Sequence, residues 1–215
     1  MPIRHLADAD SLVLLRFWTE RRGAAELPEW GDASQLPVEL LPNVAVTHRR
    51  PASVFIYAGS EILRRWGGGI TGAEVYSEVI RGDHGAYLRS LGTDAMHARK
   101  PVFSAASFRL PGDRRAMIAR LYAPFSYRGS PEPSVIVGLQ IVEGDGDLNL
   151  REAVFEDELD RRAVGDPAAV AERLAPLRAT RRDTRVEDAA VTSALARLHG
   201  SALITLTRFA APAHR

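Results

Sequence analysis

Residues 54–72, VFIYAGSEILRRWGGGITG, decide the fold, because they join a strand to a short helix and then end in glycines. The β-branched and aromatic residues 54–57 favour a strand, and Gly59 allows a sharp turn into the helix. Three residues form the apolar face of that helix: Ile62, Leu63 and Trp66. The glycines that follow supply the left-handed conformations that end a helix. The stretch therefore predicts a strand, a turn and a short helix buried along one side.

The composition of the chain excludes several classes of site. Its 215 residues fit one domain with an appendage, or two small domains, and the net charge of +1 does not indicate nucleic acid or an anionic membrane as a partner. The absence of cysteine excludes disulfides, thiolate nucleophiles, cysteine zinc sites and a flavin photoadduct on a thiol. The N-terminus lacks the apolar core of a signal peptide, and no apolar run approaches the roughly 20 residues that span a bilayer. We therefore expect a cytoplasmic protein.

Apolar periodicity and capping residues predict an α+β protein. A helix over 12–22 is followed by a strand hairpin, by short helices, by a longer helix capped by Asp83 and by three more strands. The strands are expected at 43–48, 54–58, 102–110, 115–127 and 134–142, and the two later helices at 73–80 and 83–97. An antiparallel sheet with the short helices on one face satisfies this order.

The pattern after residue 143 becomes mainly helical. Gly144 to Asp147 indicate a linker, and Asn149 is placed to cap an amphipathic helix that reaches residue 162. The acidic residues within 156–160 are then expected on the solvated face of this helix, and the arginines within 178–185 in a solvated linker. The expected division is an N-terminal helix at 1–26, a core domain at 27–143 and a helical C-terminal extension at 144–215.

Four stretches have the pattern of a known family. They are LLRFWTERRG at 14–23, LPEWGDAS at 27–34 with its Asp32, ELLPNVAV at 39–46 and FIYAGSEILRRWGGGITG at 55–72. With these stretches, residues 12–142 resemble a PAS domain, in particular the short stand-alone PAS proteins of bacteria that lack an output domain. Trp30 departs from the pattern, because this subgroup often has an arginine there.

The resemblance implies a fold and a function. A PAS domain has a five-stranded antiparallel sheet curled around a pocket, which short helices and one long helix close. The pocket takes a small ligand or cofactor, and flanking helices pass the signal to a partner. We therefore expect a non-enzymatic sensory or regulatory protein that binds a small ligand, a signalling partner or both. Because no output domain is recognised, the effector would be another protein.

The candidate pocket residues come from the strands and helices around the expected pocket. They are Tyr57, Trp66, Leu88, Leu91, Phe103, Arg120 and Tyr122, with the strand register left open. Arg120 would need a ligand carboxylate, an internal acid or water to offset its charge. The broad apolar face of helix 12–22 predicts a homodimer built on Leu12, Leu15 and Trp18.

The sequence leaves two other functions open. One is a ligand-free scaffold for protein–protein interaction, whose helical tail forms the binding surface. The other is a haem or flavin redox sensor with His84 or His97 as the iron ligand, although both positions are typical of solvated histidines at helix ends. No cofactor or metal is required by the sequence, and Ser104, Ser107 and Ser126 are interpreted as sheet residues rather than nucleophiles.

Overall fold

The computed structural model describes residues 9–49, 52–143 and 148–164, and within them seven strands form one sheet. The hydrogen-bonded order is β3-β2-β6-β5-β4-β7, and every neighbouring pair in this order is antiparallel. A short additional strand, β1, pairs in parallel with the end of β5. The strands are β1 (Glu29–Trp30), β2 (Val44–His48), β3 (Val54–Ala58), β4 (Val102–Leu110), β5 (Arg114–Tyr127), β6 (Ser130–Glu143) and β7 (Val154–Ala163). The fold is therefore α+β with a mostly antiparallel sheet, as the sequence predicts.

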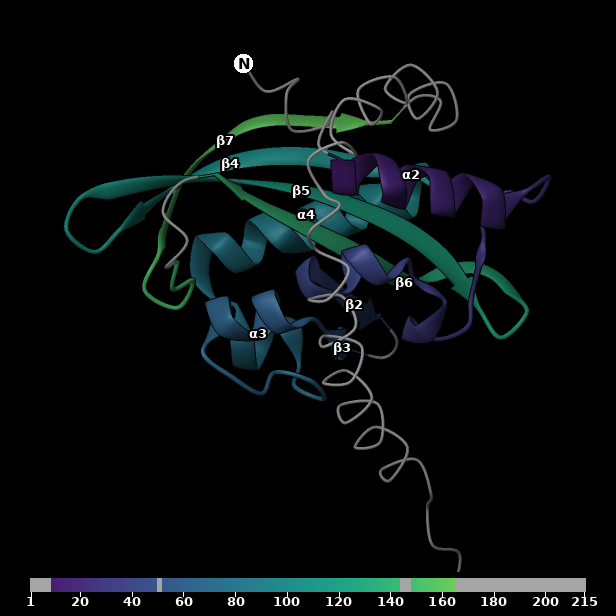
Figure 1. Cartoon of the computed structure of the whole chain (residues 1–215), viewed down its shortest axis with the longest axis horizontal. Helices are drawn as coiled ribbons and strands as arrows, with labels where there is room; N and C mark the ends of the chain where they lie inside the picture. Colours follow the sequence, from purple (N-terminus) through teal and green to yellow (C-terminus); the bar gives the residue numbers. More distant parts are fainter. Residues whose placement is uncertain (1–8, 50–51, 144–147, 165–215) are drawn as a thin grey trace, which may run out of the picture. The chain divides into compact units, whose positions relative to one another are not determined.

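Helices cover both faces of the sheet (Figure 1). The N-terminal helix α2 (Ala9–Arg22) lies on one face, and α3 (Ser60–Trp66) and α4 (Gly82–Ala98) lie on the other. In place of the helix expected at 73–80, only a π-helical turn forms, η3 (Val75–Val79). Two 3-10 turns, η1 (Ala33–Gln35) and η2 (Val38–Asn43), lead from β1 to β2. None of the helices in the described ranges is long and apolar enough to cross a membrane.

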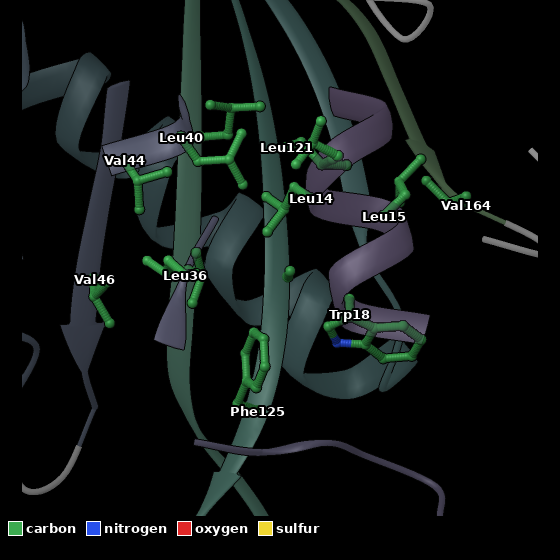
Figure 2. Close-up of a cluster of buried hydrophobic side chains, with 14 of the residues drawn as sticks. Leu14, Leu15, Trp18, Leu36, Leu40, Val44, Val46, Leu121, Phe125 and Val164 are labelled. Carbon is green, nitrogen blue, oxygen red and sulfur yellow. The ribbon is translucent and has the colours of Figure 1, made fainter. Parts of the chain in front are cut away.

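Strand alternation separates two apolar cores. On β5, Leu121 and Phe125 point toward α2, as Figure 2 shows, together with side chains of β2 and η2. The alternate residues Ile118 and Arg120 point to the opposite face, under α4. The second core lies between the sheet and the elements α3, η3 and α4. It is therefore the core that surrounds Arg120 of β5.

The N-terminal helix packs within its own chain. Leu15 and Trp18 have no exposed surface, and Leu12 is 4 % exposed. The indole Nε1 of Trp18 donates a hydrogen bond to the carbonyl oxygen of Pro124 on β5, with a distance of 2.8 Å. These three side chains therefore leave little surface for the second subunit that their apolar pattern suggested.

The helix expected over 149–162 is wrong, because this segment forms the strand β7 instead. Residues 154–163 pair with residues 102–109 of β4, and the pairing contains two register shifts. Without β7, one side of β4 would have a row of unpaired backbone N–H and C=O groups. The hydrogen bonds that β7 forms with these groups outweigh the helical propensity of a Glu-, Asp- and Arg-rich segment. The domain boundary expected at 143/144 is therefore also wrong, since the sheet continues to residue 163. The helical extension expected beyond residue 165, and the arginines within 178–185, lie outside the described residues.

The stretch at 54–72 forms the strand, turn and helix that were expected, but its first glycine acts differently. Gly59 has an ordinary φ of −70°, and a Cβ there would lie 1.8 Å from the carbonyl oxygen of Leu41. The glycine is thus required because the backbone of η2 passes very close, and not because of the turn. Gly67, with φ of +71°, ends α3 in the left-handed conformation as predicted.

Candidate ligand site

A small cavity lies between the α4 face of the sheet and the helices that cover it. Its volume is about 40 Å³, which is space for roughly three water molecules. The walls are mostly apolar, with side chains that include Phe55, Ile62, Trp66, Val75, Leu88 and Ile136. The polar residues at the cavity are Thr47, Arg49, Tyr76, Arg120, Tyr122 and Gln140. This combination of apolar walls and a few converging polar groups is typical of a binding site.

Arg120 is the central polar residue of this cavity. It lies in the middle of the sheet, with Ser104 of β4 on one side and Gln140 of β6 on the other, and is only 2 % exposed. Its Nη2 is 3.1 Å from Nε2 of His84, whereas its Nη1 is buried and has no hydrogen-bond partner among the described residues. A buried guanidinium that lacks part of its hydrogen bonds is destabilising by several kcal/mol unless something compensates it.

The aromatic rings around Arg120 are neutral, so they offset the cost of burying its charge only partly. The guanidinium carbon lies 5.6 Å from the ring centre of Tyr87 and 5.3 Å from that of Phe108. Such cation–π contacts are attractive, but they supply no hydrogen-bond acceptor for Nη1 of Arg120. Gln140 Oε1 is the acceptor for Nη1 of Arg65, at 3.4 Å, so this nearby oxygen is already engaged. Arg120, which lines the cavity, thus retains a donor that no described residue uses.

His84 is not the solvated histidine that its position near a helix cap suggested. It is 7 % exposed, and its ring is stacked on Trp66 and on Phe155 of β7, with centroid distances of 5.5 and 6.5 Å. Burial, together with the positive charge of Arg120, lowers the pKa of His84 from its usual value to about 2. The imidazole is therefore neutral, and because Arg120 can only donate, Nε2 accepts the hydrogen bond and the ring proton is on Nδ1. His84 holds Arg120 in place.

Among the residues that the structure describes, two cationic residues and no acidic one line the cavity. Arg49 comes from the end of β2 and donates a 3.3 Å hydrogen bond from Nη2 to the hydroxyl of Thr93 on α4. Burial raises the pKa of Tyr122, and the charges of Arg120 and Arg49 both act on it in the opposite direction. Arg49, Arg120 and Tyr122 all line the cavity, and the raised pKa keeps the Tyr122 hydroxyl protonated at neutral pH. The electrostatic potential of the site favours a negatively charged occupant.

Four of the seven expected pocket residues line this cavity: Trp66, Leu88, Arg120 and Tyr122. Leu91 belongs to the same core but does not line the cavity. The predictions for Phe103 and Tyr57 are wrong, because both residues lie on the α2 side of the sheet. Phe103 is buried in the α2 core, and Tyr57 packs against that core and donates its hydroxyl to the carbonyl oxygen of Leu41.

Arg49, Tyr76 and Gln140 also line the cavity, although the sequence did not single them out as pocket residues. Arg49 lies just outside the strand expected at 43–48, yet Thr47 and Arg49 are two residues apart and so share a face of an extended chain. That alternation was the available signal for Arg49. Nothing in the local pattern indicated Tyr76 or Gln140.

The two histidines do not form a haem site. His97 is exposed in the last turn of α4, far along the helix from His84. Nε2 of His84 is engaged by a cation, which disfavours an iron ion at the same atom. A cavity of about 40 Å³ is also much smaller than the several hundred Å³ typical of sites for large cofactors such as haem or flavin. No group of three or more His, Asp or Glu side chains suited to a metal ion occurs in the part of the chain described.

A second polar cluster joins β7 to the sheet and to α4. The hydroxyl of Tyr87 donates to Ser104 Oγ at 3.0 Å, and Ser104 Oγ donates to Glu158 at 2.7 Å. Glu158 is also paired with Arg161, which in turn contacts Asp94 of α4. We refer to Tyr87, Ser104, Glu158, Arg161 and Asp94 as the β7 clasp. Because Tyr87 also faces Arg120, the clasp begins beside the cavity and ends at the last described strand.

No protein-family model matches this chain, and no curated protein matches it. A function is therefore inferred from the residues of the chain itself. Among these, the buried and incompletely bonded Arg120 is the most specific observation.

Proposed function

We propose that this chain is a non-enzymatic PAS-type sensory or regulatory protein that binds a small ligand in the cavity beneath α4. The observation that carries this proposal is Arg120, a residue of the cavity wall whose buried Nη1 has no hydrogen-bond partner among the described residues. Buried polar groups in folded proteins are nearly always satisfied, so an unsatisfied cation at a cavity favours a ligand as the missing partner.

The arrangement of the elements supports the same proposal. The strands β3-β2-β6-β5-β4 are antiparallel throughout, and α3, η3 and α4 follow β3 in the chain and cover one face of them. This arrangement supports the resemblance to PAS domains, which implies a cavity between an antiparallel sheet and the helices that cover it. β1 and β7 are additions to it.

The β7 clasp supports a role in signalling. A ligand that draws Arg120 toward the cavity would change the contact between Arg120 and Tyr87, and Tyr87 is hydrogen-bonded through Ser104 to Glu158 on β7. The segment after β7 would then transmit the change to a signalling partner or to a second copy of the chain. A switch of this kind needs two arrangements of the clasp that differ in ligand affinity.

The alternative function is a ligand-free interaction scaffold, and the small size of the cavity favours it. Native mass spectrometry of the freshly purified full chain separates the two functions, in comparison with a Gly138→Val variant that fills the cavity. A Cβ at Gly138 would already lie 3.0 Å from Cε1 of Tyr122. We expect a small bound mass, or a saturable rise in melting temperature with a metabolite library, that Gly138→Val abolishes. A wild-type chain that carries no mass and responds to no compound would support the scaffold instead.

A further inference from the structure

We propose that the ligand of this cavity is a small monocarboxylate, which Arg120 and Arg49 recognise together. This inference rests on the proposed function, and it adds the chemical class of the ligand. The carboxylate would accept a hydrogen bond from Nη1 of Arg120, the donor that has no partner among the described residues. A guanidinium and a carboxylate match in shape and charge, and their hydrogen bonds are among the strongest in proteins.

The protein itself does not offset the charge of Arg120. The groups that contact its guanidinium are a neutral imidazole and two aromatic rings, and none of the cavity-lining residues is Asp or Glu. Of the acids described near this core, Glu61 pairs with Arg65 and Glu158 pairs with Arg161. The internal acid that Arg120 could have used is thus absent from the described lining, so an anion from solution is the partner that its chemistry requires.

Arg49 supplies a second positive charge at the wall of the cavity. Its guanidinium lies against Gly92 of α4, where a Cβ would be 3.3 Å from Nη1 of Arg49. The small residue at position 92 leaves room for this arginine between β2 and α4. Because Arg49, Arg120 and Tyr122 line the same cavity, a ligand there would meet two cationic residues and one tyrosine.

The dimensions and walls of the cavity select among anions. A volume of about 40 Å³ accommodates roughly three to four non-hydrogen atoms, judged by the space that one water needs. Most of the other lining residues are apolar, and they include Phe55, Leu88 and Ile136. Apolar walls suit a methyl group better than the further oxygens of phosphate or bicarbonate. Formate and acetate meet both requirements.

The test is a titration of the full chain with sodium formate, acetate, propionate, nitrate, bicarbonate, phosphate and chloride at constant ionic strength, in a buffer without carboxylates. The readouts are melting temperature and isothermal titration calorimetry. We expect saturable binding of formate or acetate, weaker binding of propionate, and no saturable effect of the inorganic anions. Arg120→Met should weaken the binding at least tenfold, and Arg49→Gln should weaken it severalfold. Arg128→Gln is the control, because Arg128 is exposed at a turn and stacks on Tyr127, away from the cavity, so binding should not change.

Several results would overturn the inference. They are equal effects of chloride and acetate, preferential binding of nitrate, bicarbonate or phosphate, or carboxylate binding that persists in Arg120→Met. If Arg120→Met does not fold, two other variants test the inference. Gly92→Ala displaces Arg49 and Gly138→Val fills the cavity, so both should weaken the binding of the carboxylate. A neutral or larger ligand that is lost in Gly138→Val would refute the carboxylate while leaving the proposed sensory function intact. Absence of any ligand would refute both.

Discussion

Acidification should destabilise this protein through His84 by an amount that can be calculated. The pKa of His84 is about 2 in the folded chain, against about 6.5 in an unfolded chain. Between these values the unfolded chain binds a proton on the imidazole that the folded chain does not, so the free energy of unfolding falls as the pH falls. Between pH 7.5 and pH 5.0 the loss from this one group is about 2 kcal/mol. The loss depends almost entirely on the unfolded pKa, because pH 5.0 lies far above the folded one.

The assay is urea denaturation followed by tryptophan fluorescence at the two pH values, in buffers without carboxylates. His84→Gln does not titrate in this range, and its Oε1 can still accept the hydrogen bond from Arg120. We therefore expect the decrease in stability between pH 7.5 and pH 5.0 to be about 2 kcal/mol smaller in His84→Gln than in the wild type. His97→Gln is the matched control, since His97 is exposed in the last turn of the same helix. If His84→Gln and the wild type lose the same stability, or if NMR shows His84 titrating near 6.5, the burial argument is refuted.

Three further substitutions test the packing around the sheet, each by urea denaturation at pH 7.5. Trp18→Phe removes the 2.8 Å hydrogen bond to a carbonyl of β5 and part of a fully buried ring. It should therefore lower the free energy of unfolding by about 2 kcal/mol. An unchanged free energy of unfolding would mean that α2 does not pack on the sheet. Gly59→Ala should lower it by about 3 kcal/mol or more, because a Cβ would lie 1.8 Å from the carbonyl oxygen of Leu41. Ser104→Ala should lower it by about 1–2 kcal/mol through the broken β7 clasp, whereas Ser107→Ala, with a 3.5 Å exposed bond, should have little effect. Equal effects of the two serine substitutions would argue against the clasp.

The strands and helices were predicted well where the local pattern is strong. β4 was expected at 102–110 and is observed there, and the hairpin of β2 and β3 also agrees with the prediction. The face that each residue occupies was harder to predict. β4 reads VFSAASFRL, with nearly every residue buried, so no polar alternation identified the side on which Phe103 lies. On β5 the same ambiguity existed, and only the structure shows that Arg120 lies under α4 while Leu121 faces α2.

The wrong prediction for β7 led directly to the wrong prediction for His84. Residues 154–163 contain enough Glu, Asp, Leu and Arg to favour a helix, and their pairing with β4 is a long-range interaction that no local pattern records. Phe155, carried by that strand, stacks at 6.5 Å from His84 and helps to bury it. A histidine beside a helix cap is usually solvated, and here a strand from about 70 residues later in the chain reverses that expectation. The candidate site therefore depends on tertiary structure more than the fold does.

The outermost strands of the described sheet are both poor templates for a further strand, and this limits how the protein can associate. β7 has charged side chains at most positions between 156 and 161, and its pairing with β4 contains two register shifts. On the opposite edge, β3 is only five residues long, and the backbone of Phe55 is bonded to Ala73 and Gly72 of the following segment. Charges, irregular register and a covering segment are features by which natural sheets resist edge-to-edge aggregation. The long apolar strands β4, β5 and β6 thus stay in the interior of the sheet, and a binding partner would use a helical or side-chain surface rather than add a strand.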